Sequence, residues 1–131
     1  MLTLGPQRAE TLFQRASLRS LFLVILGLRR HCHVVGNSMI PTLHQGDIVI
    51  YRPIKSHVFL PKEGCIVVVE DPQQPKSLII KRVHKENSLG LELRGDNQEN
   101  SIDSRQFGLV NHNYLRGIVE QIIPKTNQNR S

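Results

Sequence analysis

The sequence of 131 residues contains no tryptophan, few other aromatic residues and only two cysteines. Without large aromatic side chains, the core has to be built from valine, isoleucine and leucine, and the length suits one compact domain. Cys32 and Cys65 stand without a secretory signal and give no disulfide framework. We therefore expect two reduced, half-buried thiols in a reducing compartment, the cytoplasm.

A long hydrophobic run is also absent. The segment from Leu21 to Leu28 is apolar throughout, but its eight residues are far fewer than the roughly 20 that a membrane-spanning helix needs. Arg29 and Arg30 follow directly, where a cleavable signal peptide would need small residues. Apolar residues at helical spacing predict a helix over residues 6–28. It suits the protein's own surface or a membrane surface, and both remain open, with peripheral membrane contact expected through residues 12–28.

The net charge of +6 is concentrated at the amino-terminal end, where residues 1–33 hold five arginines and one glutamate. The rest of the chain is close to electrical balance. A nucleic-acid-binding protein would more often interleave basic and aromatic residues over its folded face, so we expect no nucleic-acid partner. A basic amino-terminal arm suits an anionic membrane surface or an acidic partner at least as well.

Short β-branched runs bounded by proline, glycine and asparagine predict strands after residue 30. The expected strands cover residues 47–52, 65–70, 77–85, 89–94 and 116–123, with an extended segment over 31–35. Helical periodicity is absent there, so we expect a mainly β fold, a compact domain of short strands behind one amino-terminal helix. The expected organisation is a helical segment over 1–30, a folded domain over 31–125 and a flexible tail over 126–131.

Two histidines could begin a metal site. His31 and His33 would share one face of a strand, while Cys32 would point to the other face. No Cys, His or acidic residue at a recognisable spacing completes a set of ligands. We therefore interpret the histidines as exposed polar residues and expect no metal.

Three ordered blocks carry the chemistry. Ser38 opens the run Ser-Met-Ile-Pro-Thr-Leu, which Gly-Asp follows at Gly46. Lys-Arg-Val begins at Lys81, 43 residues after the serine, and the third block runs from Gly95 to Gly108. A serine hydroxyl becomes a useful nucleophile only when a base takes its proton, so the second block is a candidate source of that base.

Lys81 can be a base only if its pKa falls from the ordinary value of about 10.4. Burial among apolar side chains has this effect, because a low dielectric penalises the charged form. On a strand, Lys81 would share a face with Ile79 and Val83. The alternative is an exposed strand lysine beside Arg82, and the pairing with the serine block favours burial.

Together the blocks resemble the motifs of the serine–lysine signal peptidase family over about residues 34–123. The resemblance implies that Ser38 attacks the scissile carbonyl and that Lys81 is the general base. It also implies that Lys81 returns the proton to the leaving amine and that Ser101 orients Lys81. This chemistry requires no cofactor.

The resemblance assigns supporting roles to other residues. It implies a structural ion pair between Asp103 and Arg105, joined by Arg82, that holds the third block in place. Met39 would line the substrate cleft or fill the core.

The sequence departs from the family pattern at three places, and one is the family's usual Gly-Asp after the lysine block, which is missing here. Many members carry a serine at the position of Gly36, and its hydroxyl helps to hold the oxyanion. The oxyanion hole would here depend on the Ser38 N–H and on a second, unidentified donor. In addition, only 13 residues separate Lys81 from Gly95, so the long insertion of the secretory signal peptidases is missing.

With no evident full anchor, the chain looks most similar to the short nickel-type superoxide dismutase maturation proteases. That resemblance implies removal of a leader from the nickel superoxide dismutase precursor, with the nickel belonging to the substrate.

Three alternatives remain. The first is a membrane-associated type I signal peptidase, bacterial or organellar, that uses residues 12–28 as a shallow anchor. A self-cleaving repressor-type regulatory domain would need a helix-turn-helix, whereas residues 1–30 offer one helix. A non-catalytic binding module with the same fold is the remaining alternative.

Overall fold

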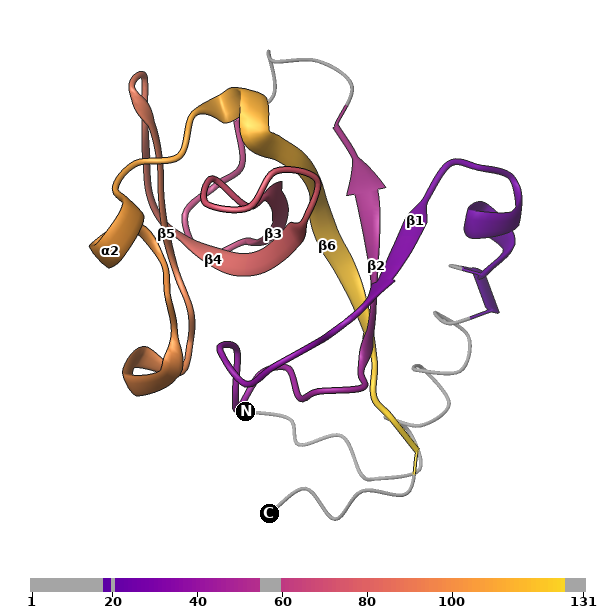
Figure 1. The fold of residues 1–131 in the computed structure, drawn as a ribbon. Helices are drawn as coiled ribbons and strands as arrows, with labels where there is room; N and C mark the ends of the chain where they lie inside the picture. Colours follow the sequence, from indigo (N-terminus) through magenta and orange to yellow (C-terminus); the bar gives the residue numbers. More distant parts are fainter. Residues whose placement is uncertain (1–17, 20, 55–59, 127–131) are drawn as a thin grey trace, which may run out of the picture.

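The computed structural model describes residues 18–19, 21–54 and 60–126 (Figure 1). Within them lies one six-stranded sheet in the spatial order β1-β2-β6-β3-β4-β5, and every neighbouring pair is antiparallel. The strands are β1 (Arg30–His33), β2 (Ile48–Pro53), β3 (Ile66–Glu70), β4 (Leu78–Asn87), β5 (Gly90–Arg94) and β6 (Leu115–Ile123). The predicted mainly β fold is confirmed, and the predicted strands differ from the observed ones by only a few residues.

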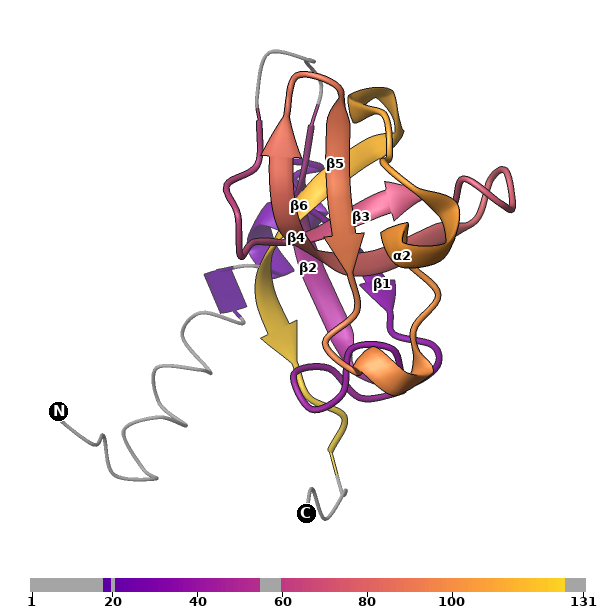
Figure 2. The same ribbon diagram turned by 90° about the vertical axis from the view of Figure 1, so that its left-hand side faces the viewer.

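The sheet is bent by irregular pairing. Register shifts occur at Ile50/Tyr51 of β2, Val68/Val69 of β3 and Val83/Lys85 of β4. Such bulges bend a strand and increase its twist. Figures 1 and 2 show the result, with β3 and β4 curling away from the direction of β2 and β6. The curl leaves each face of the sheet with its own core.

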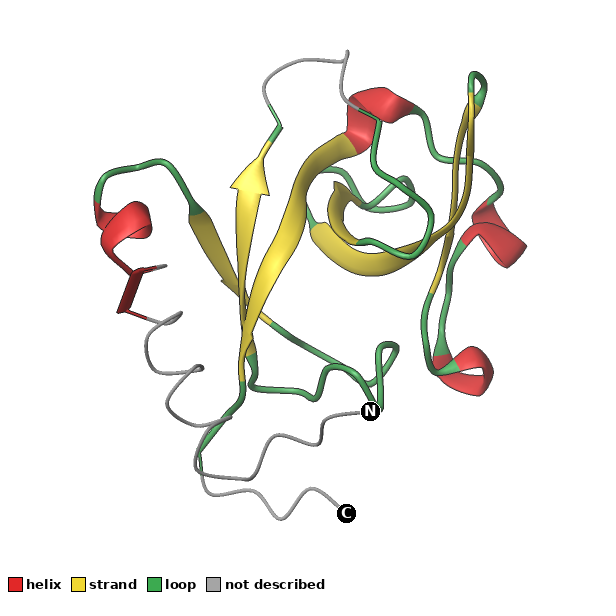
Figure 3. Ribbon diagram, turned by 180° about the vertical axis from the view of Figure 1, so that it is seen from behind, coloured by secondary structure: helices red, strands yellow, loops and turns green. Residues whose placement is uncertain are grey.

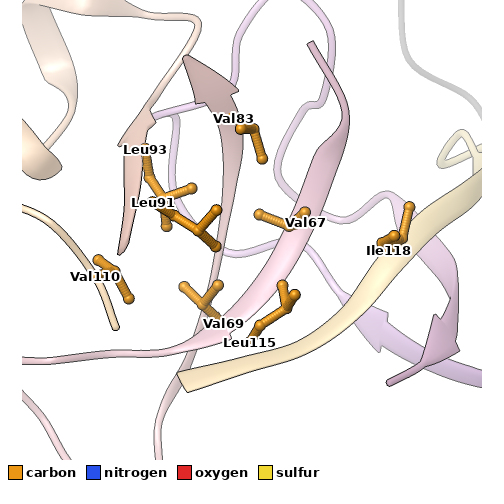
Figure 4. Close-up of a cluster of buried hydrophobic side chains, with 8 residues drawn as sticks. All are labelled: Val67, Val69, Val83, Leu91, Leu93, Val110, Leu115 and Ile118. Carbon is orange, nitrogen blue, oxygen red and sulfur yellow. The ribbon is translucent and has the colours of Figure 1, made fainter. Parts of the chain in front are cut away.

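The larger core is built almost entirely from valine and leucine, as the lack of aromatic residues required. Its buried side chains are Val67, Val69, Val83, Leu91, Leu93, Val110, Leu115 and Ile118 (Figure 4). The smaller core contains Val34, Met39, Leu43 and Val49, with Ile66 and Ile80 packed against it. Because alternate strand residues face opposite ways, β4 sends Ile79 and Val83 to the larger core and Ile80 to the smaller one.

Three short helical turns were not predicted: η1 (Gln98–Asn100), α2 (Ser104–Phe107) and η2 (His112–Tyr114). These turns are too short to show hydrophobic periodicity, so they do not alter the confirmed mainly β fold. α2 did carry a signal, however. It begins with a capping box in which Asp103 accepts the Arg105 N–H and the Gln106 side chain accepts the Asp103 N–H.

The predicted amino-terminal helix falls only partly within the described residues. Residues 18–19 and 21–25 are helical, and residues 6–17 lie outside the description, as do 127–131 of the predicted tail. This helical segment lies at the β1 side of the sheet, whereas α2 and η1 lie at the β5 side (Figure 3). No helix among the described residues combines the length and the apolar character needed to cross a membrane.

Candidate active site

Lys81 lies in the middle of β4, where it pairs with Val67 of β3, and only 4% of its surface is exposed. Its predicted burial on the face of Ile79 and Val83 is therefore confirmed. Burial is the largest influence on this amine and lowers its pKa. The negative charges of Asp103 and Asp71 oppose the shift without cancelling it.

A hydroxyl group, not a carboxylate, contacts the lysine amine. Lys81 Nζ donates to Ser101 Oγ at 3.1 Å, and Ser101 Oγ donates in turn to Asp103 Oδ2 at 2.8 Å. Since the single proton of Ser101 is directed to Asp103, the Ser101 oxygen can only accept from Lys81. The amine is thus fixed in position by a neutral partner that does little to stabilise its charged form.

Asp103 holds Ser101 in place and is itself held by several hydrogen bonds. Its carboxylate is fully buried and accepts from Arg105 Nε and Nη2, each at 2.9 Å, and from the Gly95 N–H at 3.0 Å. Burial by itself would raise its pKa, but the hydrogen bonds from Arg105, Gly95 and Ser101 together hold the pKa well below the usual range. Asp103 is therefore charged and neutralised by Arg105, as the predicted ion pair requires.

Arg82 does not join this ion pair, so that part of the expectation was wrong. Adjacent residues of a strand point to opposite faces, and Arg82 therefore lies across β4 from Lys81. Its Nε and Nη2 donate to the two carboxylate oxygens of Asp96 at 2.8 and 2.7 Å, and its Nη1 donates to the Gly64 carbonyl at 2.7 Å. Asp96 also accepts from Thr42, which belongs to the serine block.

Sequence reasoning missed the role of Asp96, although its place directly after Gly95 in the third block was a signal. Hydrogen bonding to Arg82 lowers the pKa of Asp96, and the same contact raises the pKa of Arg82. The two faces of β4 thus hold one amine with a lowered pKa and one firmly charged guanidinium.

Gly95 packs between the serine and lysine sides of the site. A Cβ atom placed on Gly95 would lie 2.5 Å from the Ser38 carbonyl oxygen and closer still to the Ser101 hydroxyl. The next residues bind the serine loop directly, because the Asn97 N–H donates to the Ser38 carbonyl at 2.9 Å and Asn97 Nδ2 donates to the Asn37 carbonyl at 3.0 Å. The third block therefore fixes the loop that carries Ser38 and the lysine together.

Ser38 and Lys81 line the same space. A cavity of about 170 Å³ is bounded by both residues together with Val34, Met39 and Ile80. A second cavity, of about 320 Å³, also has Ser38 and Lys81 in its lining. Met39 is 2% exposed and fills the smaller core as the alternative prediction has it, and it also bounds the first cavity.

Gly36 has a φ of +81°, and a Cβ atom there would meet nothing within 4 Å. The backbone conformation, and not crowding, is therefore what favours glycine at this position. Among the hydrogen bonds of the described residues, none uses the Ser38 N–H, so this group is available to an oxyanion. Gly36 itself contributes no side-chain donor.

Asp47 fixes the end of the serine block through hydrogen bonds, a role that the sequence motif alone did not reveal. Its buried carboxylate accepts the His44 N–H at 2.9 Å and the Lys125 N–H at 3.0 Å. The carboxylate thereby closes the loop on itself and joins it to the segment that follows β6.

The remaining sequence candidates stay separate from this chemistry. Cys32 and Cys65 are both free thiols and only partly buried. His31 and His33 are exposed, with ring centroids 6.3 Å apart. In the part of the chain that the structure describes, no group of three His, Cys, Asp or Glu side chains could hold a metal ion.

Comparison with known proteins adds to this geometry. A family profile described as "Signal peptidase, peptidase S26" matches residues 11–84. Mitochondrial inner membrane protease subunit 1 is 33% identical over 107 residues in both Mus musculus and Homo sapiens, which covers 63% of this chain and 61% of each relative. Mitochondrial ATP-independent inner membrane protease subunit 1a of Arabidopsis thaliana is 28% identical over 142 residues, covering 83% of this chain and 82% of the relative. The chain thus spans about 61% of the mammalian relatives it matches.

Proposed function

The chain belongs to the S26 family of signal peptidases, and from that premise we propose that it is a serine endopeptidase with Ser38 as nucleophile and Lys81 as general base. The observation that carries the proposal is the buried amine of Lys81, held at 3.1 Å by Ser101 beside a cavity that Ser38 also lines. An amine with a lowered pKa can accept a proton near neutral pH, whereas an exposed lysine is already protonated there.

The proposed reaction has two halves. As Ser38 Oγ attacks the scissile carbonyl carbon, its proton passes to Lys81 Nζ, and the carbonyl π electrons move onto the oxygen. When the tetrahedral intermediate collapses, the C–N bond breaks and Lys81 gives the proton to the leaving amine. Water then attacks the acyl ester with Lys81 again as base, which releases the acid and restores the Ser38 hydroxyl.

Positioning residues support this chemistry through Lys81. Ser101 holds the amine on its rotamer, and Asp103 holds Ser101 by accepting its only proton. The backbone N–H of Ser38 stabilises the oxyanion. Because Gly36 supplies no hydroxyl, the second donor comes from another group of the protein or from the substrate complex.

The substrate we propose is a precursor protein with an amino-terminal leader presented at a membrane. The relatives named above are described as inner membrane protease subunits, which favours a type I signal peptidase-like enzyme over the trimming of nickel superoxide dismutase precursor. Their description as subunits also leads us to propose a partner subunit for this chain.

A peripheral contact with the membrane completes the proposal. In the described part of the amino-terminal segment, apolar side chains are exposed to solvent, and the most exposed are Leu18, Phe22 and Ile25. Arg19 and Arg30 are exposed beside them. Apolar side chains flanked by arginines are typical of a helix that lies in an anionic bilayer surface.

Co-expression with candidate precursors tests the proposed function. This protein would be expressed with a membrane-targeted leader precursor or with nickel superoxide dismutase precursor, alongside Ser38→Ala and Lys81→Met variants as controls. We expect the membrane-targeted precursor to be cut at one bond, read by mass spectrometry of the new amino terminus, and both variants to leave it intact. Cleavage by either variant would contradict the dyad, and cleavage of the dismutase precursor alone would reassign the substrate.

The same cultures test localisation and partnership. After fractionation, we expect the protein to sediment with membranes and to be released by detergent. A fully active enzyme purified as a single chain would show that a partner subunit is dispensable.

A further inference from the structure

The second cavity at Ser38 and Lys81 has a polar wall. Its lining consists of Val35, Gly36, Asn37, Ser38, Asp71, Gln73, Ile79, Lys81, Asn100, Ile102 and Phe107. Of these, all within the described part of the chain, only Lys81 and Asp71 carry an acidic or basic side chain. Asp71 is therefore the acidic group of the cleft.

Asp71 is held in place by the turn between β3 and β4. Its N–H donates to the Ser77 carbonyl at 2.8 Å, and its Oδ1 accepts the Gln73 N–H at 2.9 Å. The preceding residue, Glu70, is the last residue of β3 and forms an ion pair with Arg116. Among the ion pairs of the described residues, none includes Asp71.

Among the described residues, no cation forms an ion pair with Asp71 beside the proposed dyad. The other carboxylate near the lysine, Asp103, is matched by Arg105 at 2.9 Å. Lys81 must be uncharged before it can act as a base, so in the competent enzyme it does not balance Asp71 either. A carboxylate that is partly removed from water and lacks a cation attracts one from a bound molecule.

We propose that Asp71 makes the cleft select precursors that carry a lysine or arginine side chain close to the scissile bond. This inference rests on the proposed peptidase function and names a feature of its substrate. The cation of the substrate would bind Asp71 across the second cavity, while the scissile carbonyl lies at Ser38. Asp71 is then a specificity-determining residue, separate from the groups that make and break bonds.

Matched peptides test this selection on the full chain. The junction cut in the co-expression assay would be copied as a peptide series in which lysine or glutamine replaces each residue flanking the scissile bond in turn. At one position we expect the lysine peptide to show kcat/KM about three- to fivefold higher than the glutamine peptide. The ratio should fall to about one in Asp71→Asn, which keeps an oxygen for the Gln73 N–H.

Glu63→Gln is the matched control, because it removes one exposed negative charge outside both cavities lined by Ser38 and Lys81. This variant should keep the lysine preference. The proposal is overturned if wild type shows no lysine preference, or if Asp71→Asn shifts the pH profile of both peptides equally and leaves their ratio unchanged. The second result would mean that Asp71 acts only through Lys81. If the protein cuts neither the precursor in the co-expression assay nor any peptide, with its partner subunit present, the peptidase function itself is overturned, which distinguishes the two failures.

Discussion

Lys81 and Arg82 are neighbours on one strand, yet their environments on the two faces of β4 shift their pKa values in opposite directions. Lys81 is 4% exposed, its amine donates to the hydroxyl of Ser101, and burial lowers its pKa. Arg82 binds both oxygens of Asp96, which raises its pKa. Burial with a neutral partner prepares a base, whereas pairing with a carboxylate makes a permanent structural cation.

The two faces also differ in what they hold together. On the Lys81 face, Asp103 collects hydrogen bonds that position the amine through Ser101. On the Arg82 face, Asp96 links β4 to Thr42 in the serine loop. The two residues of the proposed dyad therefore depend on both faces, one for the amine of Lys81 and the other for the loop that carries Ser38.

Replacing the base should give the largest effect. Lys81→Met keeps much of the apolar stem and removes the amine, so we expect kcat/KM to fall on the order of 10⁴-fold. The free energy of unfolding should not fall, because an apolar group replaces a desolvated amine. Peptide cleavage together with thermal unfolding checks both, and an active Lys81→Met enzyme would exclude Lys81 as the base.

Disturbing the contact of Gly95 with Ser38 and Ser101 should give the next largest loss of rate. In Gly95→Ala, the new methyl group would collide with the Ser38 carbonyl and the Ser101 hydroxyl. Displacement of reacting groups by about 1 Å can cost about 10²-fold in rate, and we expect a loss of this order. Single-turnover cleavage measures it, and an unchanged rate would show that the backbone can move away without cost.

Removing the buried carboxylate should affect stability as well as rate. Asp103→Asn leaves Arg105 without its counter-ion, and we expect the free energy of unfolding to fall by about 3 kcal/mol in urea denaturation. Because the folded pKa of Asp103 lies below the unfolded value of about 3.9, its contribution is present above that pH and is lost as the pH falls through the folded pKa. Equal acid sensitivity of wild type and variant would contradict this assignment.

The matching change on the other face should cost less. In the pair of Arg82 and Asp96, the side chains are 35% and 16% exposed, so solvent screens their interaction. We expect Asp96→Asn to lower the free energy of unfolding by about 1 kcal/mol, with a smaller loss at high salt. A loss as large as that of Asp103→Asn would mean that the two faces contribute equally.

The smallest effect is a dependence of stability on pH. Because the folded pKa of Lys81 lies below its unfolded value of about 10.4, the folded state loses this proton first. The contribution to stability therefore grows as the pH rises from the folded pKa toward the unfolded one. The difference in unfolding free energy between wild type and Lys81→Met should change across this window, and an Arg82→Lys control should leave the change intact.

Much of the fold followed from local sequence. The β-branched runs marked β2, β3, β4 and β6, and Asn87 in the hairpin between β4 and β5 accepts the two N–H groups that close the turn. The burial of Lys81 followed from strand alternation. The turns η1, α2 and η2 were missed because three or four residues are too few to show a helical pattern of apolar residues. The capping box at Asp103 was nevertheless a signal for α2.

The site was predicted less completely than the fold. Ser38, Lys81 and Ser101 were named from motifs, and the structure joins Lys81 to Ser101 as expected. The partner of Arg82 was assigned wrongly, because the choice between Asp96 and Asp103 depends on the face of β4 and not on distance along the chain. The cavity that brings Asp71 to Ser38 could not be predicted, since its lining combines stretches that lie far apart in the sequence.

The contact between Asp47 and Lys125 has a practical consequence for anyone who shortens or tags this protein. The aliphatic part of Lys125 lies over Gly46, while its N–H holds the Asp47 carboxylate. Residue 125 lies outside both cavities at Ser38, yet it restrains the loop that carries Ser38. Deleting the chain from residue 125 onward should therefore weaken catalysis without removing any residue of the cleft, because the Asp47 carboxylate would lose one of the N–H groups that hold it.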